Sequence, residues 1–561
     1  MAQTKPQQED TTDAIKETFE SIVIAFILAF VFRAYVVEAF VIPTGSMAPT
    51  LLGEHFVVRC KQCGYQFTGD ANEDDLRATA VGPDGRERSY RSSQITEARG
   101  EVHATCPMCH FQCRLTKGSR TSAGDRILVH KYIYSVNDPR RWDVVVFKAP
   151  HNPSINYIKR LIGLPNEGLV IIEGNIYVCP NYSPTKPDNA WRIARKTDLA
   201  ANHRGFKVQN AVWQPVYHSS YVPLDGGRDR DWRVPWVAVE KDKWQIDDPI
   251  PGRAYRHDSN DAGTIRFDFR RAESMMSTPW YAYNQMKGRF EADPIEDVRV
   301  MASFVPDTEG LAVSMQTTAR VDNYPEAPRV AISANIDADG QVVLQRRESS
   351  RVDADKSKTI TLAKGKIEPF VAGKCRDVEL WYVDQHALVW VDGKLVAEHR
   401  FEITMDTLQK RQPLEPRDFA DVRIKVSGSP VSLHRVGVDR DIFYAAVNKS
   451  SPSQRGQGIM PKDQFSRRDV YPLNPIKLEH NQFFCLGDNS PMSLDSRFWP
   501  EPNAWIDLRM RPKGIDKVQA GVVPRQLMMG RAFFVYFPAP HRTSPNKVGV
   551  FPNFGQMRFI N

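Results

Sequence analysis

The feature of this sequence that most constrains its fold is a long series of short β-rich runs over residues 205–447. The runs are rich in Val, Ile, Leu and aromatic residues, and turn-forming clusters separate them, as is typical of antiparallel strands. In the clearest hairpin, Asp392-Gly393 joins residues 387–391 to 394–397. The other runs are 297–305, 311–315, 330–334, 342–344 and 378–383. This pattern predicts an antiparallel β-sandwich in a mainly β chain.

Length and composition indicate a large globular protein. The chain has 561 residues, which is enough for several domains. Its hydrophobic fraction of 41% and charged fraction of 25% exclude a disordered chain and a polytopic membrane protein. The 75 Lys and Arg residues exceed the 67 Asp and Glu residues by only eight, and no long run of like charges occurs. The charge therefore gives no indication of nucleic acid binding.

An apolar run lies close to the N-terminus. Residues 21–32 carry no charge, but a bilayer-spanning helix needs about 20 residues. A helix over 15–35 is long enough, and its charged residues lie near its ends, where long side chains can reach the headgroups. We therefore expect a transmembrane helix over 15–35 after a cytoplasmic tail over 1–14. A buried core helix and a cleaved secretory signal are the alternatives.

Four of the eight Cys residues form two Cys-x-x-Cys pairs, a pattern typical of tetrahedral zinc sites. These residues are Cys60, Cys63, Cys106 and Cys109. Two disulfides or a redox pair are the alternatives, and Cys113, His103 and His110 are other candidate ligands. We expect a structural zinc ion, because four thiolate ligands leave no open position for catalysis.

Two segments carry residue types suited to covalent catalysis. Ser46 lies in the stretch 40–51, where Pro and Gly interrupt any helix and place the Ser on a turn. A Ser hydroxyl needs a partner base to act as a nucleophile. Lys159 lies between apolar neighbours in the stretch 157–165, which follows a predicted strand over 142–148. A lysine that is desolvated in this way can lose its charge.

These two segments and two others resemble the bacterial type I signal peptidases, membrane-anchored endopeptidases with a Ser-Lys dyad. The resemblance rests on four boxes in the order of that family: the Ser46 stretch, Gly-Asp-Arg-Ile-Leu-Val over 124–129, the Lys159 stretch, and Gly-Asp-Asn-Ser-Pro-Met-Ser-Leu-Asp-Ser-Arg over 487–497. Residues 523–532 resemble the closing strand of the family. Asn166-Glu167 departs from the family, where many members have Gly before an acid.

The resemblance implies a role for each residue of the boxes. Ser46 is the expected nucleophile and Lys159 the expected general base, with a pKa lowered by burial to about 7 to 8. Ser493 is expected to hydrogen-bond the lysine nitrogen. The Thr44 hydroxyl is expected to hold the oxyanion together with the backbone N–H of Ser46. Four supporting residues are expected to hold the Ser493 loop, with an ion pair between the last two: Asp488, Asn489, Asp495 and Arg497.

The resemblance also divides the chain into domains. The expected catalytic domain has three parts, and two insertions and a linker separate them: 36–59, a zinc-ribbon-like insertion over 60–117, 118–204, a sandwich insertion over 205–447, a linker over 448–469, and 470–561. The end of the sandwich insertion, 436–444, resembles the closing strand of concanavalin A-like sandwiches. Because this insertion contains none of the boxes, we expect its ends to lie close together and the insertion to be separable from the site.

The resemblance implies a single-pass peptidase of the bacterial inner (cytoplasmic) membrane, with its catalytic domain on the extracytoplasmic side. It is expected to remove signal peptides from exported preproteins after small residues, without a catalytic cofactor. Expected partners are signal peptides, the lipid bilayer and a glycan or protein ligand of the sandwich. The alternative is a surface protein that binds glycans or proteins on a disused peptidase scaffold. A self-cleaving regulator of transcription is disfavoured, because the sequence has an apolar anchor and no DNA-reading helix pair.

Overall fold

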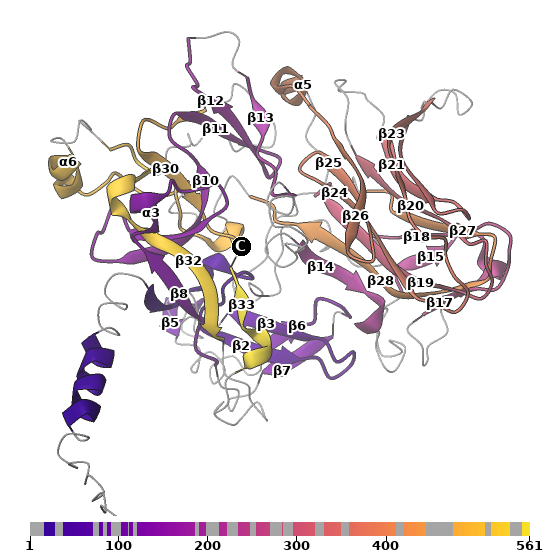
Figure 1. The fold of residues 1–561 in the computed structure, drawn as a ribbon, viewed down its shortest axis with the longest axis horizontal. Coiled ribbons are helices and arrows are strands. Elements are labelled where there is room, and N and C mark those ends of the chain that lie inside the picture. Colours follow the sequence, from indigo (N-terminus) through magenta and orange to yellow (C-terminus); the bar gives the residue numbers. More distant parts are fainter. Residues whose placement is uncertain are drawn as a thin grey trace, which may run out of the picture.

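A computed structural model describes most of the chain, and the described residues are almost all in β-strands or the loops between them (Figure 1). The described ranges are 16–27, 37–70, 78–81, 87–90, 102–109, 111–115, 121–185, 190–197, 213–221, 234–246, 254–269, 283, 295–319, 330–348, 358–410, 420–444, 475–510, 518–538 and 553–560. The prediction of a mainly β chain is confirmed. The predicted tail and the predicted linker lie outside the described residues.

The three parts of the chain that are expected to form the catalytic domain build two antiparallel sheets. The larger sheet has the order β1-β8-β32-β9-β10-β30-β31, with β33 paired to β32. Its strands are β1 (Val37–Val41), β8 (Arg126–Lys131), β9 (Val144–Lys148), β10 (Asn156–Gly163), β30 (Gln482–Leu486), β31 (Val523–Pro524), β32 (Met528–Phe537) and β33 (Arg558–Phe559). Since strands from all three parts alternate in this sheet, it brings together boxes that are far apart in the sequence.

The smaller sheet has the order β13-β12-β11-β29. Its strands are β11 (Glu167–Ile172), β12 (Asn175–Pro180), β13 (Arg192–Ile193) and β29 (Ile476–Lys477). Strand β11 is buried on both faces: Leu169 and Ile171 belong to the core of the catalytic sheets, whereas Val170 and Ile172 belong to the core of the second insertion. Alternate side chains of a strand point to opposite faces, so β11 joins the two cores.

The second insertion forms two further antiparallel sheets. One has the order β16-β17-β28-β19-β24-β25-β26 with β14 paired to β28, and the other has the order β15-β18-β27-β20-β21-β22-β23. The strands of the first are β14 (Trp213–His218), β16 (Trp244–Gln245), β17 (Tyr255–His257), β19 (Val298–Pro306), β24 (Arg376–Val383), β25 (His386–Val391), β26 (Lys394–Arg400) and β28 (Val431–Asp441). Those of the second are β15 (Trp236–Ala238), β18 (Gly263–Phe267), β20 (Ala312–Ala319), β21 (Val330–Ile336), β22 (Gln341–Glu348), β23 (Lys358–Lys366) and β27 (Arg423–Ser427).

These two sheets share one apolar core. Val300 and Leu380 of the first sheet and Val313 and Ile332 of the second all belong to it, so the sheets pack face to face. The predicted hairpin is β25–β26, and its turn residues Asp392 and Gly393 have φ values of 47° and 78°, which a tight two-residue turn requires. The described strands nearest to the two ends of the insertion lie side by side, because β14 pairs with β28.

The described residues of the Cys-containing insertion form short hairpins. They are β2 (His55–Arg59) with β3 (Gln66–Asp70), β4 (Ala78–Val81) with β5 (Glu87–Tyr90), and β6 (Val102–Thr105) with β7 (Gln112–Leu115). Strand β2 begins before the predicted boundary at residue 60, and His55 pairs with Ser122 in an isolated bridge. Because a hairpin needs both of its strands, the β2–β3 hairpin lies across the predicted boundary at residue 60.

Helices are few and short in the described part of the chain. They include α3 (Ile133–Val136), α5 (Met405–Lys410) and α6 (Ala504–Met510). Residues 16–27 are also helical, with exposed apolar side chains such as Phe19 and Ile24, and this helix lies apart from the folded body (Figure 1). The rest of the predicted transmembrane helix, 15 and 28–35, lies outside the described residues. Of the helices that are described, none has both the length and the apolar character needed to cross a bilayer.

Candidate active site

The predicted nucleophile and the predicted base lie within hydrogen-bond distance of each other. Ser46 is in a single 3-10 turn, η1 (Gly45–Met47), and Lys159 is in β10. The amino group of Lys159 donates to Ser46 Oγ at 2.8 Å and to the carbonyl oxygen of Ile158 at 3.1 Å. The two boxes thus meet as the resemblance implies.

The surroundings of Lys159 favour its neutral form. The side chain is only 3% exposed, and burial lowers the pKa of Lys159 to about 8 although Asp495, Cys485 and Asp488 act in the opposite direction. Within the described structure, no carboxylate forms an ion pair with this amino group. The ring of Tyr157 lies 5.2 Å from the nitrogen. With this pKa, roughly a tenth of the lysine is uncharged at pH 7 and about half at pH 8.

The turn that carries Ser46 is fastened to the last box by Asn489. The backbone N–H of Asn489 donates to the carbonyl oxygen of Ser46 at 3.1 Å. Its side-chain amide donates to the carbonyl oxygen of Gly45 at 2.9 Å. Asn489 therefore fixes the position of the Gly45–Met47 turn, called the nucleophile turn below, relative to the loop that contains Ser493.

Arg160 and Asp488 form a buried ion pair beside the site. Arg160 Nε donates to Asp488 Oδ1 and Arg160 Nη2 to Asp488 Oδ2, both at 2.7 Å, and the two side chains are 3% and 0% exposed. Thr50 Oγ1 also donates to Asp488 Oδ2, at 2.5 Å. Arg160 is not among the predicted site residues. A second charge in an otherwise apolar strand was the available signal, because such a residue must find a partner if it is buried.

Asp495 and Arg497 form the expected ion pair, and it is completely buried. Arg497 Nε donates to Asp495 Oδ1 at 2.8 Å and Arg497 Nη2 to Asp495 Oδ2 at 2.7 Å. The same carboxylate accepts the backbone N–H of Gly487, and Arg497 donates to Ser490 Oγ at 2.8 Å. These bonds tie both ends of the Ser493 loop together.

The expected hydrogen bond between Ser493 and Lys159 is not formed. The hydrogen bonds of the lysine amino group go to Ser46 and Ile158 instead, and Ser493 Oγ is a buried atom without a partner among the described groups. Ser493 nevertheless lies beside the nucleophile turn. A Cβ atom at Gly487 would lie 2.1 Å from Ser493 Oγ and 2.4 Å from the carbonyl oxygen of Ser46, so only Gly fits between them.

Thr44 lies at the N-cap position of the nucleophile turn. Its backbone is extended (φ −121°, ψ 159°), and its side chain makes no capping hydrogen bond and is exposed. The turn therefore does not use the Thr44 hydroxyl, which stays available to a ligand.

The Gly-Asp box fastens both flanks of the nucleophile turn. Asp125 exchanges backbone and side-chain hydrogen bonds with Leu52 on one flank, at 2.9 and 3.1 Å, and its carbonyl oxygen accepts the N–H of Ile42 on the other. A Cβ atom at Gly124 would lie 1.8 Å from the carbonyl oxygen of Ile42. This close approach explains the glycine of the box.

The departure at Asn166-Glu167 does not disturb the fold. Asn166 has a φ of 64°, a left-handed conformation that Asn adopts more readily than most residues with a side chain. Glu167 accepts the backbone N–H of Leu164 at 3.0 Å and forms an ion pair with Arg141. The turn before β11 is thus formed without glycine.

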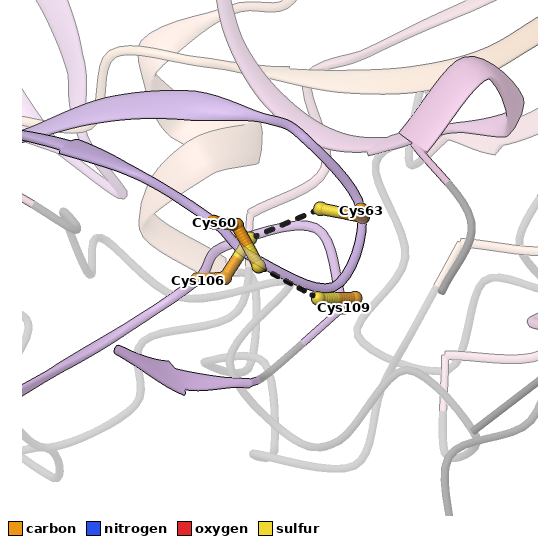
Figure 2. Close-up of side chains that lie close together, drawn as sticks. All are labelled: Cys60, Cys63, Cys106 and Cys109. Atoms are coloured by element: carbon orange, nitrogen blue, oxygen red, sulfur yellow. Dashed lines mark hydrogen bonds between the residues drawn. The ribbon is translucent and has the colours of Figure 1, made fainter. Parts of the chain in front are cut away.

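The four Cys residues of the predicted zinc site converge (Figure 2). The Sγ atoms of Cys60 and Cys109 are 3.5 Å apart, those of Cys63 and Cys106 are 3.6 Å apart, and all four thiols are buried and within 4.8 Å of one another. A disulfide needs an S–S distance of about 2.0 Å, whereas tetrahedral Zn–S bonds of about 2.3 Å place the sulfurs roughly 3.8 Å apart. The arrangement fits a closed tetrahedral metal site.

The other candidate ligands do not join this group. Cys113 is buried nearby, but its thiol contacts the carbonyl oxygen of Phe111 at 3.8 Å and is not one of the four convergent sulfurs. His110 and the side chain of His103 lie outside what the structure describes. The four convergent thiols are therefore the candidate metal centre.

Comparison with known proteins identifies the class to which this fold and site belong. Residues 15–76, 117–216 and 389–537 match the family described as signal peptidase, peptidase S26. These stretches make up more than half of the chain and contain Ser46, Lys159 and Ser493 in turn. The chain belongs to the signal peptidase family.

Individual relatives match a smaller part of the chain. A signal peptidase I from Rickettsia massiliae (strain Mtu5) is 26% identical over 176 residues, which cover 31% of this chain and 47% of that protein. A signal peptidase I from Leptolyngbya laminosa is 38% identical over 79 residues, 12% of this chain and 39% of that protein. The chain thus spans about half or less of the length of these relatives. Among solved structures, the carbohydrate-binding module CBM66 from Bacillus subtilis covers 37% of this chain and 96% of its own, with 12% identity and a TM-score of 0.22.

Proposed function

We propose that this chain is a membrane-anchored serine endopeptidase that removes signal peptides from exported preproteins. Ser46 is the nucleophile and Lys159 the general base. Membership of the signal peptidase family supports the reaction class. The observation that carries the proposal is the 2.8 Å contact between Ser46 Oγ and a buried lysine whose pKa is lowered to about 8.

The chemistry follows from that contact. Neutral Lys159 takes the proton of Ser46 as its oxygen attacks the scissile carbonyl, which forms a tetrahedral oxyanion. The intermediate then collapses to an ester on Ser46, and the lysine returns the proton to the departing amine of the mature protein. Water, deprotonated by the same lysine, hydrolyses the ester, releases the signal peptide and restores the serine.

The neighbouring groups have supporting roles in this proposal. The backbone N–H of Ser46 and the exposed Thr44 hydroxyl stabilise the oxyanion, since neither the turn nor its cap uses that hydroxyl. Ser493 is a positioning residue, whose hydroxyl lies beside the turn and has no partner among the described residues. The two buried ion pairs, Arg160–Asp488 and Arg497–Asp495, keep the Ser493 loop and the nucleophile turn in register.

We also propose that the apolar N-terminal segment anchors the chain in the bacterial cytoplasmic membrane, with the site on the extracytoplasmic side. Support comes from the exposed apolar side chains of residues 16–27, which the folded body does not cover. Because few residues separate this segment from Ser46, the site stays within about 50 Å of the bilayer even if the intervening chain is fully extended.

We propose a structural zinc ion at the four convergent thiols, in a zinc-ribbon-like insertion. The support is the closed, buried group of four sulfurs with the spacing of a tetrahedral site. The purified chain should carry about one zinc, and Cys60→Ser or Cys106→Ser should release it. Cys375→Ser is the matched control, because Cys375 is exposed and outside the group, and it should retain the metal. Two disulfides in a metal-free chain would overturn the assignment.

Peptide cleavage tests the main proposal. The purified full chain should cut a synthetic leader peptide with Ala at the −1 and −3 positions, and mass analysis should place the cut after the −1 residue. Cleavage should disappear in Ser46→Ala while the circular dichroism spectrum stays unchanged. A folded wild-type chain that leaves the peptide intact would favour the alternative of a binding protein on a disused scaffold.

A further inference from the structure

One residue of the second insertion lies at the nucleophile turn. Tyr283 is 4% exposed and packs against Ala48 and the partly buried Leu52, which both belong to the segment that follows Ser46. Its hydroxyl donates to the carbonyl oxygen of Glu54 at 3.4 Å. The insertion that was expected to be separable from the site thus contributes a residue that contacts the segment after Ser46. No local pattern in the sequence indicates this contact, because it joins segments more than two hundred residues apart.

The ring of Tyr283 determines what fits at Gly45. A Cβ atom at Gly45 would lie 2.3 Å from Cε1 of Tyr283 and 2.8 Å from its Oη, and the three nearest atoms all belong to this tyrosine. The φ of Gly45 is outside the left-handed range, so its backbone conformation does not require glycine. Gly45 is therefore required for a steric reason, because the ring of Tyr283 occupies the space that a side chain at this position would need.

Gly45 is in turn linked to the loop behind the nucleophile. Its carbonyl oxygen accepts the N–H of Ala48 at 3.0 Å, which closes the turn, and the side-chain amide of Asn489 at 2.9 Å. A shift of Gly45 would therefore disturb both bonds and with them the position of Ser46, the next residue.

The insertion that supplies Tyr283 is firmly attached to the catalytic sheets. Its core includes Tyr177 and Ile193 of the smaller catalytic sheet. Lys196, just after that sheet, forms buried ion pairs with Asp384 and Asp441 of the insertion at 2.6 and 2.9 Å. The core of the insertion is therefore joined to the smaller sheet, and Tyr283 itself is held at the turn by its contacts with Ala48, Leu52 and Glu54.

We propose that Tyr283 is a positioning residue for the peptidase, which holds the Gly45–Met47 turn against Asn489 and so keeps Ser46 Oγ within reach of Lys159. This inference rests on the proposed function. It makes the sandwich insertion a part of the catalytic unit, and it implies that replacing 205–447 by a linker impairs cleavage of even a short peptide.

The first test changes the ring alone. Tyr283→Ala should lower kcat for a short leader peptide by about tenfold to a hundredfold, because small displacements of reacting groups have effects of that size, and should leave KM nearly unchanged. Tyr283→Phe should restore most of kcat, since it keeps the ring. Phe370→Ala is the matched control: Phe370 is buried against Phe304 within the sandwich, so its loss should lower stability and leave kcat of the folded chain unchanged.

The second test uses the steric pair. Gly45→Ala should lower kcat because its new methyl group meets the ring of Tyr283, and Gly45→Ala combined with Tyr283→Ala should be more active than Gly45→Ala alone. Wild-type kcat in Tyr283→Ala, or no recovery in the double variant, would overturn the inference while leaving the proposed function intact. A folded wild-type chain that cuts no leader peptide would overturn both.

Discussion

Two lysines of this chain are equally buried, but the pKa of one is lowered and the pKa of the other is raised. Lys159 at the candidate site and Lys196 at the junction with the sandwich are each 3% exposed. Burial lowers the pKa of Lys159 to about 8. Burial also acts to lower the pKa of Lys196, but Asp384 and Asp441 outweigh it and raise the pKa above the ordinary value.

The difference lies in the partners. Lys196 contacts two carboxylates, and both stabilise its charged form. Lys159 forms hydrogen bonds with a hydroxyl and a carbonyl oxygen. The nearby carboxylates of Asp488 and Asp495 form ion pairs with Arg160 and Arg497 instead. Burial by itself therefore does not produce a general base. The two arginines matter because they keep Asp488 and Asp495 from becoming ion-pair partners of Lys159.

The largest effect should come from removing the reacting groups. Ser46→Ala, Lys159→Ala and Lys159→Arg should each lower kcat/KM by about 10⁴-fold or more, and Arg fails because a guanidinium stays charged. The measurement is cleavage of the leader peptide by variants whose circular dichroism spectra match the wild type. Lys477→Ala, at an exposed lysine, is the control and should be fully active. Turnover by Lys159→Arg would contradict a neutral base.

Removing a partner of Lys196 should destabilise the fold. Asp384→Ala leaves a buried ammonium group with one carboxylate fewer, which should lower the free energy of unfolding by about 3 to 5 kcal/mol. Adding both Lys196→Met and Asp441→Asn to this variant removes the remaining buried charges and should recover part of the loss. Denaturant unfolding of both variants measures the effect. A loss below about 1 kcal/mol would show that the Lys196 pairs contribute little.

A carboxylate placed beside Lys159 should make it behave like Lys196. Cys485 is a buried neighbour of the lysine, so Cys485→Asp should raise the pKa of Lys159 and lower kcat/KM at pH 8 by about tenfold relative to Cys485→Asn, its neutral counterpart. The gap between the two variants should narrow at about pH 10, where even a partnered lysine begins to lose its proton. Equal activity of the two variants at pH 8 would show that catalysis does not depend on the charge of Lys159.

The smallest effect is expected at Ser493. Its hydroxyl has no partner among the described residues and makes no hydrogen bond to Ser46 or Lys159, so Ser493→Ala should lower kcat by only about tenfold. Peptide cleavage again measures it, with Ser496→Ala as a comparison on the same loop, where the hydroxyl accepts the backbone N–H of Cys485. Complete loss of activity in Ser493→Ala would mean that it binds Lys159 during the reaction.

Local sequence signals predicted the strands of the sandwich and the residues of the site. The β-rich runs and the Asp392-Gly393 turn are properties of a few neighbouring residues, and they appear in the structure where expected. Ser46 and Lys159 were predicted from the boxes in which they lie, and the structure places their side chains 2.8 Å apart. The spacing of the Cys pairs likewise predicted which sulfurs converge.

Contacts between distant segments could not be predicted from these signals. The pairing of Arg160 with Asp488, of Lys196 with Asp384, and of Tyr283 with Gly45 depends on how the sheets pack. Nothing in the local sequence distinguishes Tyr283 from a core tyrosine of the sandwich. The Ser493 hydrogen bond was wrongly expected for the same reason, since the partners of the lysine depend on geometry within an ångström.

The pH dependence of peptide cleavage tests most directly whether burial makes Lys159 a neutral base. A protonated lysine cannot accept the serine proton, so kcat/KM for the leader peptide should rise with pH through an ionisation at about 8 and should be about 50-fold lower at pH 6 than at pH 8. A profile that is flat from about pH 6 to 9, or that rises only near the ordinary lysine pKa of about 10.4, would contradict the account.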